Sequence, residues 1–337
     1  MSLHPRSPHP FIDSKIHRAL PLLYHWFHHY QRPLPWRLHS SPYRIAVSEF
    51  MCQQTRITTV IPYYHRWLRR FPSWSALARA PQAAVLRHWE GLGYYRRARF
   101  LHALAKAVQH LPQRQLPSDP LKLRLLPGIG HYTAGAISSI AFAIPSPAFD
   151  GNVARVLGRL LAHRRRSPNL KKLQEFAGAI VPKRNPGIHN QALMELGALV
   201  CLPKIPLCTN CPLRSVCPSK NKLPRPTTSR PKPTALQENL LIVQHGKSIW
   251  LTRQHPANRW RSLSLLPTLS AEPKKALPLG KILYPYTRYQ ISADIFLSPH
   301  PPKGIIGRWF NPAALRLATL PAPHRRALSL LPQNRNL

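Results

Sequence analysis

Four of the five cysteines fall within 17 residues, with the spacing C-x6-C-x2-C-x5-C. Thiolates this close together indicate metal ligation, by zinc or by a cubane iron–sulfur cluster. A zinc ribbon normally contains two C-x2-C pairs, whereas this chain has one, Cys208 and Cys211. We therefore expect a [4Fe–4S] cluster held by Cys201, Cys208, Cys211 and Cys217.

The chain contains only ten acidic residues, so acid–base chemistry has few candidates. Glu49 lies three residues after Ala46 and three before Cys52, on the apolar side of a predicted helix over 42–57. Burial there raises a carboxyl pKa, as a general acid requires, unless Glu49 only bonds a neighbour. Asp150 precedes a predicted helix that starts near Gly151. A role as the N-cap of that helix explains the residue at least as well as a catalytic role. Two such carboxylates can divide the cleavage of a glycosidic bond between proton donation and stabilisation of a cationic sugar.

The segment LPGIGHYTAG (126–135) joins an apolar helix end, a Gly-x-Gly turn and a new helix of small residues. It predicts a helix-hairpin-helix over about 121–143, in which Gly128 and Gly130 let an anion approach the backbone amides. Taken alone, Gly-x-Gly more often marks a simple tight turn. With 49 Lys+Arg against 10 Asp+Glu, a formal charge of +39, the anion is expected to be a DNA phosphate. A lineage-wide bias towards basic residues is the alternative source of the charge.

Apolar residues recur at helical spacing over 101–111, 153–161 and 170–180, and little of this region alternates with period two. We expect an all-α domain over 14–222 that includes the cysteine loop 201–217. Residues 223–235 are rich in proline and basic residues and predict a linker. Strands around 240–243, 249–251 and 289–297, a hairpin at 245–247 and a helix at 312–318 predict a smaller α+β domain over 236–337.

No apolar stretch approaches 18 residues, and no apolar signal region follows the N-terminus. We therefore expect no membrane association. A cytoplasmic protein, associated with the bacterial nucleoid through DNA, is the localisation that the sequence favours.

Six stretches resemble the adenine DNA glycosylases of the MutY family, within the helix-hairpin-helix glycosylase superfamily. They are LPWR (34–37), SEFMCQQT (48–55), GLGYYRRA (91–98), LPGIGHYTAGAI (126–137), DGNVARV (150–156) and NQALMELGALVC (190–201). The cysteine spacing also resembles that of the family, and the stretches occur in the family's order over about 30–220. Cys52 departs from the pattern, because that position usually carries a larger apolar residue.

The resemblance implies a monomeric base-excision repair enzyme that hydrolyses the N-glycosidic bond of adenine paired with 8-oxoguanine or guanine in double-stranded DNA. It implies that Glu49 protonates the adenine and that Asp150 stabilises the cationic sugar. The other substrate- and DNA-binding residues that it implies are Trp36, Arg37 and Gln191 near the extruded adenine, Gln54 and Tyr94 as wedges in the base stack, and Gln53, Gly128, Gly130, Tyr132 and Asn152. For Tyr94 and Tyr95 core packing is the alternative, and Tyr95 is expected in the core.

The resemblance also implies that the C-terminal domain is a Nudix-like (MutT-like) module that recognises 8-oxoguanine. Tyr286-Thr287-Arg288 is the best match to the family's Phe-Ser-His-like loop. Thr287 and Arg288 are therefore candidate binding residues, and Arg288 contacts either a guanine edge or a phosphate. From residue 239 onward only Glu272 and Asp294 are acidic, so we expect no pyrophosphate hydrolysis, which needs metal-binding glutamates.

Two other functions remain open. An endonuclease III-like glycosylase/lyase for oxidised pyrimidines shares the hairpin, the aspartate and the cluster. LPWR, SEFMCQQT and Tyr132, in place of that enzyme's lysine nucleophile, count against it. A non-catalytic nucleic-acid-binding protein would explain the charge and the hairpin, but not a glutamate on an apolar helix face.

Overall fold

The computed structural model describes residues 14–162, 168–220, 233–260 and 263–332, so most of the predicted linker 223–235 lies outside the described residues. The chain divides into two compact units. The first contains Met1–Ala78 and Ala103–Ser229, and the second contains Arg79–His102 and Arg230–Leu337. The division falls before the last residue of α5 (Trp74–Arg79) and inside α7 (Arg96–Val108), so the second unit includes a segment from the helical part of the sequence.

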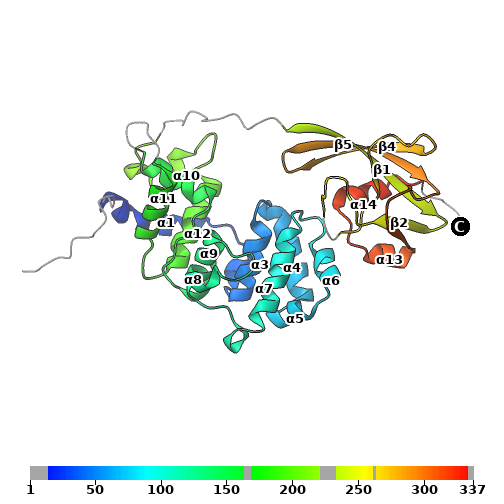
Figure 1. The fold of residues 1–337 in the computed structure, drawn as a ribbon. Helices are drawn as coiled ribbons and strands as arrows, with labels where there is room; N and C mark the ends of the chain where they lie inside the picture. Colours follow the sequence, from blue (N-terminus) through cyan, green and yellow to red (C-terminus); the bar gives the residue numbers. More distant parts are fainter. Residues whose placement is uncertain (1–13, 163–167, 221–232, 261–262, 333–337) are drawn as a thin grey trace, which may run out of the picture. The chain divides into compact units, whose positions relative to one another are not determined.

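Helices make up the regular structure of the first unit within the described residues (Figure 1). They are α1 (Ser14–Tyr30), α2 (Pro35–Leu38), α3 (Pro42–Cys52), α4 (Ile57–Arg70), α5 (Trp74–Arg79), the end of α7, α8 (Pro120–Leu123), α9 (His131–Phe142), α10 (Gly151–Leu160), α11 (Leu170–Ala179) and α12 (Pro186–Leu199), with short 3-10 turns η1 (Pro112–Arg114), η2 (Cys208–Asn210) and η3 (Arg214–Val216). The helices predicted over 101–111, 153–161 and 170–180 are confirmed as α7, α10 and α11. Within these described parts of the chain, no helix is both long and apolar enough to span a membrane.

The helix predicted over 42–57 is interrupted. Helix α3 begins after Ser41, whose side chain accepts a hydrogen bond from the Arg44 amide at 3.4 Å, and it ends at Cys52. Gln54 then adopts a left-handed backbone conformation (φ 56°), and α4 starts at Ile57. A non-glycine residue is rarely left-handed, so the turn that follows the helix of Glu49 is locally strained.

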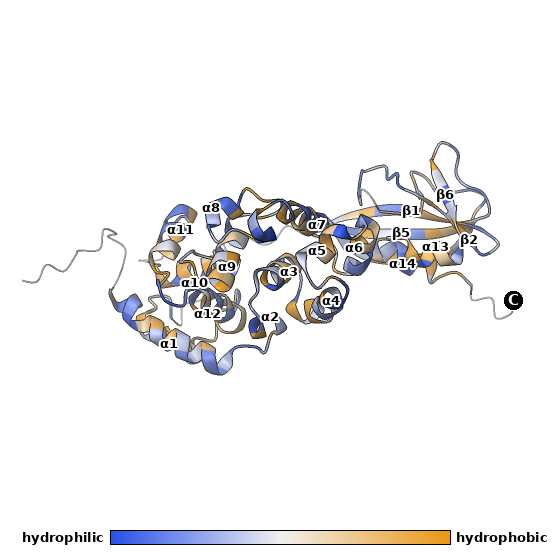
Figure 2. Cartoon of the chain, turned by 90° about the horizontal axis from the view of Figure 1, so that it is seen from below, coloured by the Kyte–Doolittle hydropathy of each residue, from blue (hydrophilic) through white to orange (hydrophobic). Residues whose placement is uncertain are grey.

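Helices α9 and α12 form the centre of the first unit. Seven of the twelve residues of α9 and nine of the fourteen of α12 are buried, and Figure 2 shows hydrophobic residues concentrated in both helices. Helix α9 packs on α3 and α12, and α12 also packs on α1 and α10. The elements that carry residues 49, 150 and 191 therefore meet around two buried helices.

The second unit contains a six-stranded mixed sheet of order β4-β5-β1-β2-β6, with β3 beside β1 (Figure 1). Its strands are β1 (Thr234–His245), β2 (Ser248–Thr252), β3 (Thr268–Leu269), β4 (Leu277–Tyr286), β5 (Tyr289–Ser298) and β6 (Gly307–Phe310). Strands β1 and β5 are parallel, and the other neighbours are antiparallel. Helix α13 (Pro312–Leu317) packs on β2 and β6, and α14 (Ala322–Leu328) packs on β4. The predicted hairpin at 245–247 is confirmed, since Gln244 pairs with Ile249.

Candidate active site and metal centre

Glu49 is half-buried on α3, between neighbours that are almost completely buried. The hydroxyl of Tyr132, at the start of α9, interacts with its carboxyl group and also lies 3.7 Å from Met194 Sδ. Burial raises the pKa of Glu49 to about 7, helped by the charge of Asp150 and opposed by the Tyr132 bond. At neutral pH the carboxyl group therefore exists in both forms, as proton transfer near pH 7 requires.

Asp150 is the N-cap of α10, as its position before the helix predicts. Its Oδ1 accepts a hydrogen bond from the Val153 amide at 2.7 Å, and its Oδ2 accepts one from Asn152 Nδ2 at 3.1 Å. Gly197 of α12 leaves room for this arrangement, because a Cβ there would lie 2.6 Å from the Cβ of Asn152. Asp150 therefore caps the helix with one oxygen and is held in place through both.

Arg37 and Gln191, which the family resemblance implies near the substrate base, are in contact. Arg37 Nε donates to Gln191 Oε1 at 3.2 Å, and its Nη2 lies 2.9 Å from Glu195 Oε2. Arg32 binds the same carboxylate through its backbone amide, Nε and Nη2 at 2.7–2.9 Å. Burial alone would raise the pKa of Glu195, but the two arginines lower it to about 2. Trp36, also assigned to this region, is buried in the adjoining α2.

Sequence reasoning missed Glu195 and Arg32, although a signal existed. Glu195 is one of ten acidic residues and follows Gln191 by four positions, which places both on one side of α12. It also missed Asn190, which is buried and whose Oδ1 accepts a hydrogen bond from the Ala148 amide at 3.1 Å. Asn190 Nδ2 donates to the Ser146 carbonyl at 2.8 Å, so Asn190 fixes the segment that leads to Asp150.

The helix-hairpin-helix segment has the predicted form, with α8, a turn and α9. Gly128 lies in the turn with φ 76°, a conformation that favours glycine. Gly130 is the N-cap of α9, and a Cβ built on it would meet nothing within 4 Å, so its surroundings are open. Gln53 Nε2 lies 3.5 Å from Thr133 Oγ1 and links the end of α3 to the first turn of α9.

The two residues assigned as wedges share an unusual backbone. Gln54 (φ 56°) and Tyr94 (φ 46°) are both left-handed and both exposed, Tyr94 to 50%. They belong to different units. The neighbouring Tyr95 is buried, as expected. Strained backbone at exposed polar or aromatic side chains is common where a protein engages a ligand.

Thr287 and Arg288 form the two-residue turn between β4 and β5. Thr287 is left-handed (φ 51°), and both residues are exposed. Arg288 Nη2 donates to the hydroxyl of Tyr289 at 2.9 Å, and its guanidinium lies 5.1 Å from the centroid of that ring. The hairpin tip therefore presents a hydroxyl and a cation to solvent.

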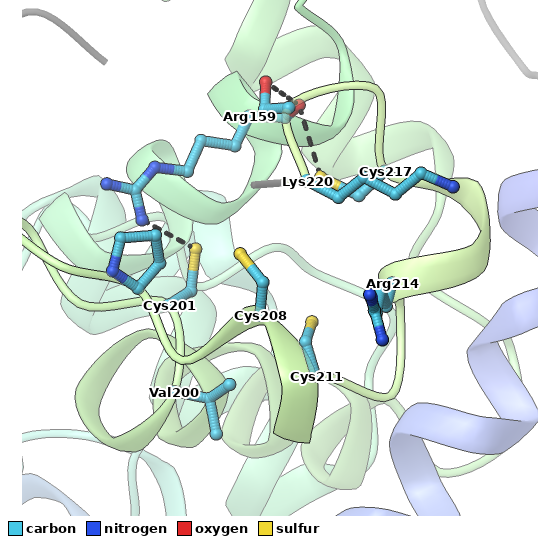
Figure 3. Close-up of a pocket in the computed structure, with 10 residues that line it drawn as sticks. Arg159, Val200, Cys201, Cys208, Cys211, Arg214, Cys217 and Lys220 are labelled. Carbon is cyan, nitrogen blue, oxygen red and sulfur yellow. Dashed lines mark hydrogen bonds between the residues drawn. The ribbon is translucent and has the colours of Figure 1, made fainter. Parts of the chain in front are cut away.

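The four clustered cysteines line one cavity, between the last turn of α10, the end of α12 and the loop that follows (Figure 3). Arg159 Nη1 lies 3.1 Å from Cys201 Sγ, and Arg214 and Lys220 also line the cavity. Arg155 connects this loop to α10 and α12, with Nε bonded to the Cys201 carbonyl at 2.8 Å and Nη2 to the Gly197 carbonyl at 2.7 Å.

The chemistry of the cavity can be compared with the cluster that the cysteine spacing predicts. Four thiols line it together with the basic side chains of Arg159, Arg214 and Lys220. A four-iron cube is wider than one ion, so its thiolate ligands surround a cavity. Thiolate ligands bring negative charge, and the basic residues of the cavity offset it. The residues present therefore fit a [4Fe–4S] group.

Comparison with known proteins agrees with this architecture. Residues 47–183 match the model of the HhH-GPD superfamily base excision DNA repair proteins. The adenine DNA glycosylase of Buchnera aphidicola subsp. Baizongia pistaciae is 37% identical over 249 residues, which cover 72% of this chain and 71% of that protein. A thermostable thymine-DNA glycosylase matches with a TM-score of 0.57 and 25% identity, covering 62% of this chain and 97% of its own. A trapped endonuclease III–DNA covalent intermediate matches with a TM-score of 0.54 and 23% identity, covering 63% and 99% of the two chains, and shows the fold alone.

The matched region and the relative of 37% identity define a base-excision repair DNA glycosylase of the helix-hairpin-helix superfamily. Within that class the chain belongs to the adenine DNA glycosylase family, as the bacterial relative shows. It is therefore an enzyme that hydrolyses N-glycosyl bonds.

Proposed function

We propose that this enzyme removes adenine paired with 8-oxoguanine or guanine from double-stranded DNA, acting as a monomer. The observation that supports the proposal most strongly is the pKa of about 7 at Glu49, beside the carboxylate of Asp150. One group can hold a proton at neutral pH, and the other is fixed by hydrogen bonds that both of its oxygens accept.

In this mechanism Glu49 donates a proton to the departing adenine, and the negative charge of Asp150 stabilises the oxocarbenium-like sugar. Tyr132 bonds Glu49 and holds the carboxyl group in place. Trp36, Arg37 and Gln191 surround the extruded base, and the Glu195 carboxylate orients Arg37. Gln53, Asn152 and the amides around Gly128 and Gly130 complete the binding of substrate and DNA.

The enzyme is proposed to be monofunctional, releasing the base without cutting the strand. A lyase needs an amine that forms a Schiff base with the sugar, and position 132 carries a phenol. Burial and the nearby Glu49 charge raise the pKa of Tyr132 well above its ordinary value, so it stays protonated. This favours adenine hydrolysis over the endonuclease III-like alternative.

The C-terminal domain, over 236–337 after a linker at 223–235 and a catalytic domain at 14–222, is proposed to be Nudix-like and to recognise 8-oxoguanine without hydrolysis. The exposed Thr287 and Arg288 at one hairpin tip support a recognition role. Helices α13 (PAALRL) and α14 (APHRRAL) contain no acidic residue that could hold metal ions for hydrolysis.

Cys201, Cys208, Cys211 and Cys217 are proposed to hold the [4Fe–4S] cluster. A bound cluster would cross-link the loop to Cys201 at the end of α12 and would stabilise the loop in one conformation. Arg214 and Lys220, which line the same cavity, then remain on an ordered loop where they can meet phosphates.

The test is base release from duplexes carrying adenine opposite 8-oxoguanine, guanine or thymine, with an oxidised pyrimidine opposite guanine as a fourth substrate. Strands are analysed with and without alkali. We expect adenine release opposite 8-oxoguanine and guanine, strand breaks only after alkali, and loss of activity in Glu49→Gln and Asp150→Asn. Glu175→Gln, an exposed glutamate on α11, is the matched control. Cleavage of the oxidised pyrimidine without alkali would instead establish the lyase.

A further inference from the structure

The loop that carries Tyr94 is held rigidly from within its own unit. Trp89 Nε1 donates to the Gly93 carbonyl at 3.0 Å, and Arg97 Nη2 donates to the carbonyls of Leu92 and Gly93 at 3.0 and 3.2 Å. The Arg97 guanidinium also lies 5.5 Å from the centroid of the Tyr94 ring. The half-exposed Tyr94 therefore projects from a backbone that is fixed by buried donors.

A second set of contacts reaches the same loop from residues 318–325, hereafter the anchoring segment. The guanidinium of Arg325 forms a two-point ion pair with Glu90, with Nη2 to Oε2 at 3.1 Å and Nε to Oε1. Arg325 Nη2 also donates to the Ala318 carbonyl at 2.7 Å. The hydroxyl of Tyr95 donates to the Leu320 carbonyl at 3.2 Å, and both Tyr95 and Leu320 are buried.

These contacts lie on both sides of Tyr94, four residues before it and one after it. The Glu90 side chain is 16% exposed, and a planar guanidinium paired with a carboxylate through two hydrogen bonds restricts orientation strongly. The adjacent Arg326 behaves differently, because it is exposed and donates to the Leu283 carbonyl of β4 at 3.2 Å. Of these two neighbouring arginines of α14, Arg325 therefore contacts the Tyr94 loop and Arg326 contacts the sheet.

We infer that the anchoring segment positions the Tyr94 loop, with Arg325 and Glu90 as positioning residues for base extrusion. The inference rests on the proposed role of Tyr94 as a wedge. It assigns to the C-terminal part of the chain a mechanical task that is distinct from reading the base opposite the adenine. Loosening the loop would slow extrusion, whereas phosphate contacts and the carboxylate chemistry would be unaffected.

The experiment follows extrusion with 2-aminopurine in place of the target adenine, using stopped-flow fluorescence on the full-length enzyme. Arg325→Ala and Glu90→Gln should each slow the fluorescence rise by on the order of tenfold to a hundredfold. The dissociation constant for DNA should change less than about twofold, because few phosphate contacts are touched. Arg325→Lys should restore part of the rate, and the double variant should be no slower than the slower single variant, because both changes remove one interaction. Arg326→Ala is the matched control and should extrude at the wild-type rate.

Tyr94→Ala distinguishes the proposed wedge role of Tyr94 from the positioning role of Arg325 and Glu90. If Tyr94→Ala extrudes at the wild-type rate, the wedge role under the proposed function is wrong. If Tyr94→Ala is slow while Glu90→Gln and Arg325→Ala are both normal, the wedge role stands and the positioning inference is overturned. Equal slowing in Arg326→Ala and Arg325→Ala would also overturn it, because the effect would then follow from lost charge or lost stability of α14.

Discussion

Two glutamates of the first unit carry opposite pKa shifts. Glu49 on α3 has its pKa raised to about 7, and Glu195 on α12 has its pKa lowered to about 2, from the same ordinary value of 4.5. Burial acts upward on both. The difference lies in the partners, because Glu49 has one phenol hydroxyl and a nearby carboxylate, whereas Glu195 has two arginines. The partners, and not the depth of burial, therefore decide whether the pKa of a buried glutamate is raised or lowered.

The largest expected effect is on catalysis at the first glutamate. Glu49→Gln should lower single-turnover adenine release by about 10²–10⁴-fold, because the amide cannot donate the proton that the leaving base needs. The folded structure should remain intact, which circular dichroism and a thermal melt can check. Residual activity within tenfold of wild type would show that another group supplies the proton.

The anchor should show the reverse pattern. Glu195→Ala leaves Arg32 and Arg37 without their shared partner and should lower the free energy of unfolding by about 3–5 kcal/mol. Urea unfolding followed by circular dichroism measures this loss. The surface variant Glu175→Ala should change it by less than about 0.5 kcal/mol. If Glu195→Ala and Glu175→Ala lowered the free energy of unfolding equally, the Glu195 ion pairs would not stabilise the fold more than a surface residue does.

The raised pKa of Glu49 and the lowered pKa of Glu195 should change the stability of the fold with pH in opposite directions. Between pH 4.5 and 7 the folded protein holds the Glu49 proton longer than the unfolded chain does, so stability from this group falls by up to about 3 kcal/mol as pH rises. Glu195 contributes about the same amount above pH 4.5 and loses it as pH falls towards 2. Glu49→Gln should therefore be more stable than wild type at pH 8, as urea unfolding at several pH values would reveal. Equal stability at pH 8 contradicts the raised pKa.

The smallest effect is expected at the hydroxyl that bonds Glu49. In Tyr132→Phe the ionised carboxylate loses a donor, so the pKa of Glu49 should rise further, by about one unit. The alkaline limb of kcat/KM for adenine release should move to higher pH by the same amount. An unchanged limb would mean that Tyr132 does not stabilise the carboxylate during the reaction.

Periodicity and turn chemistry predicted much of the fold. The helices α7, α10 and α11 and the β1–β2 hairpin follow directly from apolar spacing and a glycine turn. The break after Cys52 escaped prediction, because residues 53–56 (QQTR) contain no Gly or Pro to mark the end of a helix. The parallel pairing of β1 with β5 also escaped, since it joins residues more than 50 positions apart. Long-range pairing leaves no local pattern in a sequence.

The candidate site was predictable in its residue types and not in its contacts. Motif spacing indicates Glu49, Asp150 and the four cysteines individually. The Arg32–Glu195–Arg37 arrangement depends on how α2 and α12 meet, and Asn190 depends on a loop carbonyl at residue 146. Such interactions are set by tertiary packing, so one sequence shows only the polar residue and not its partner.

The absence of a side chain at position 197 has a consequence for mutational tolerance. A single methyl group there would sit 2.6 Å from the Cβ of Asn152, whose amide bonds the Asp150 carboxylate. Alanine is otherwise the most favourable residue within a helix, so an isolated α12 would gain from Gly197→Ala while the neighbouring helix would be displaced. At position 197, alanine would therefore favour the helix itself but would clash with the side chain of Asn152. Gly197→Ala, a substitution between two small residues, would therefore disturb the orientation of the Asp150 carboxylate, 47 positions away in the sequence.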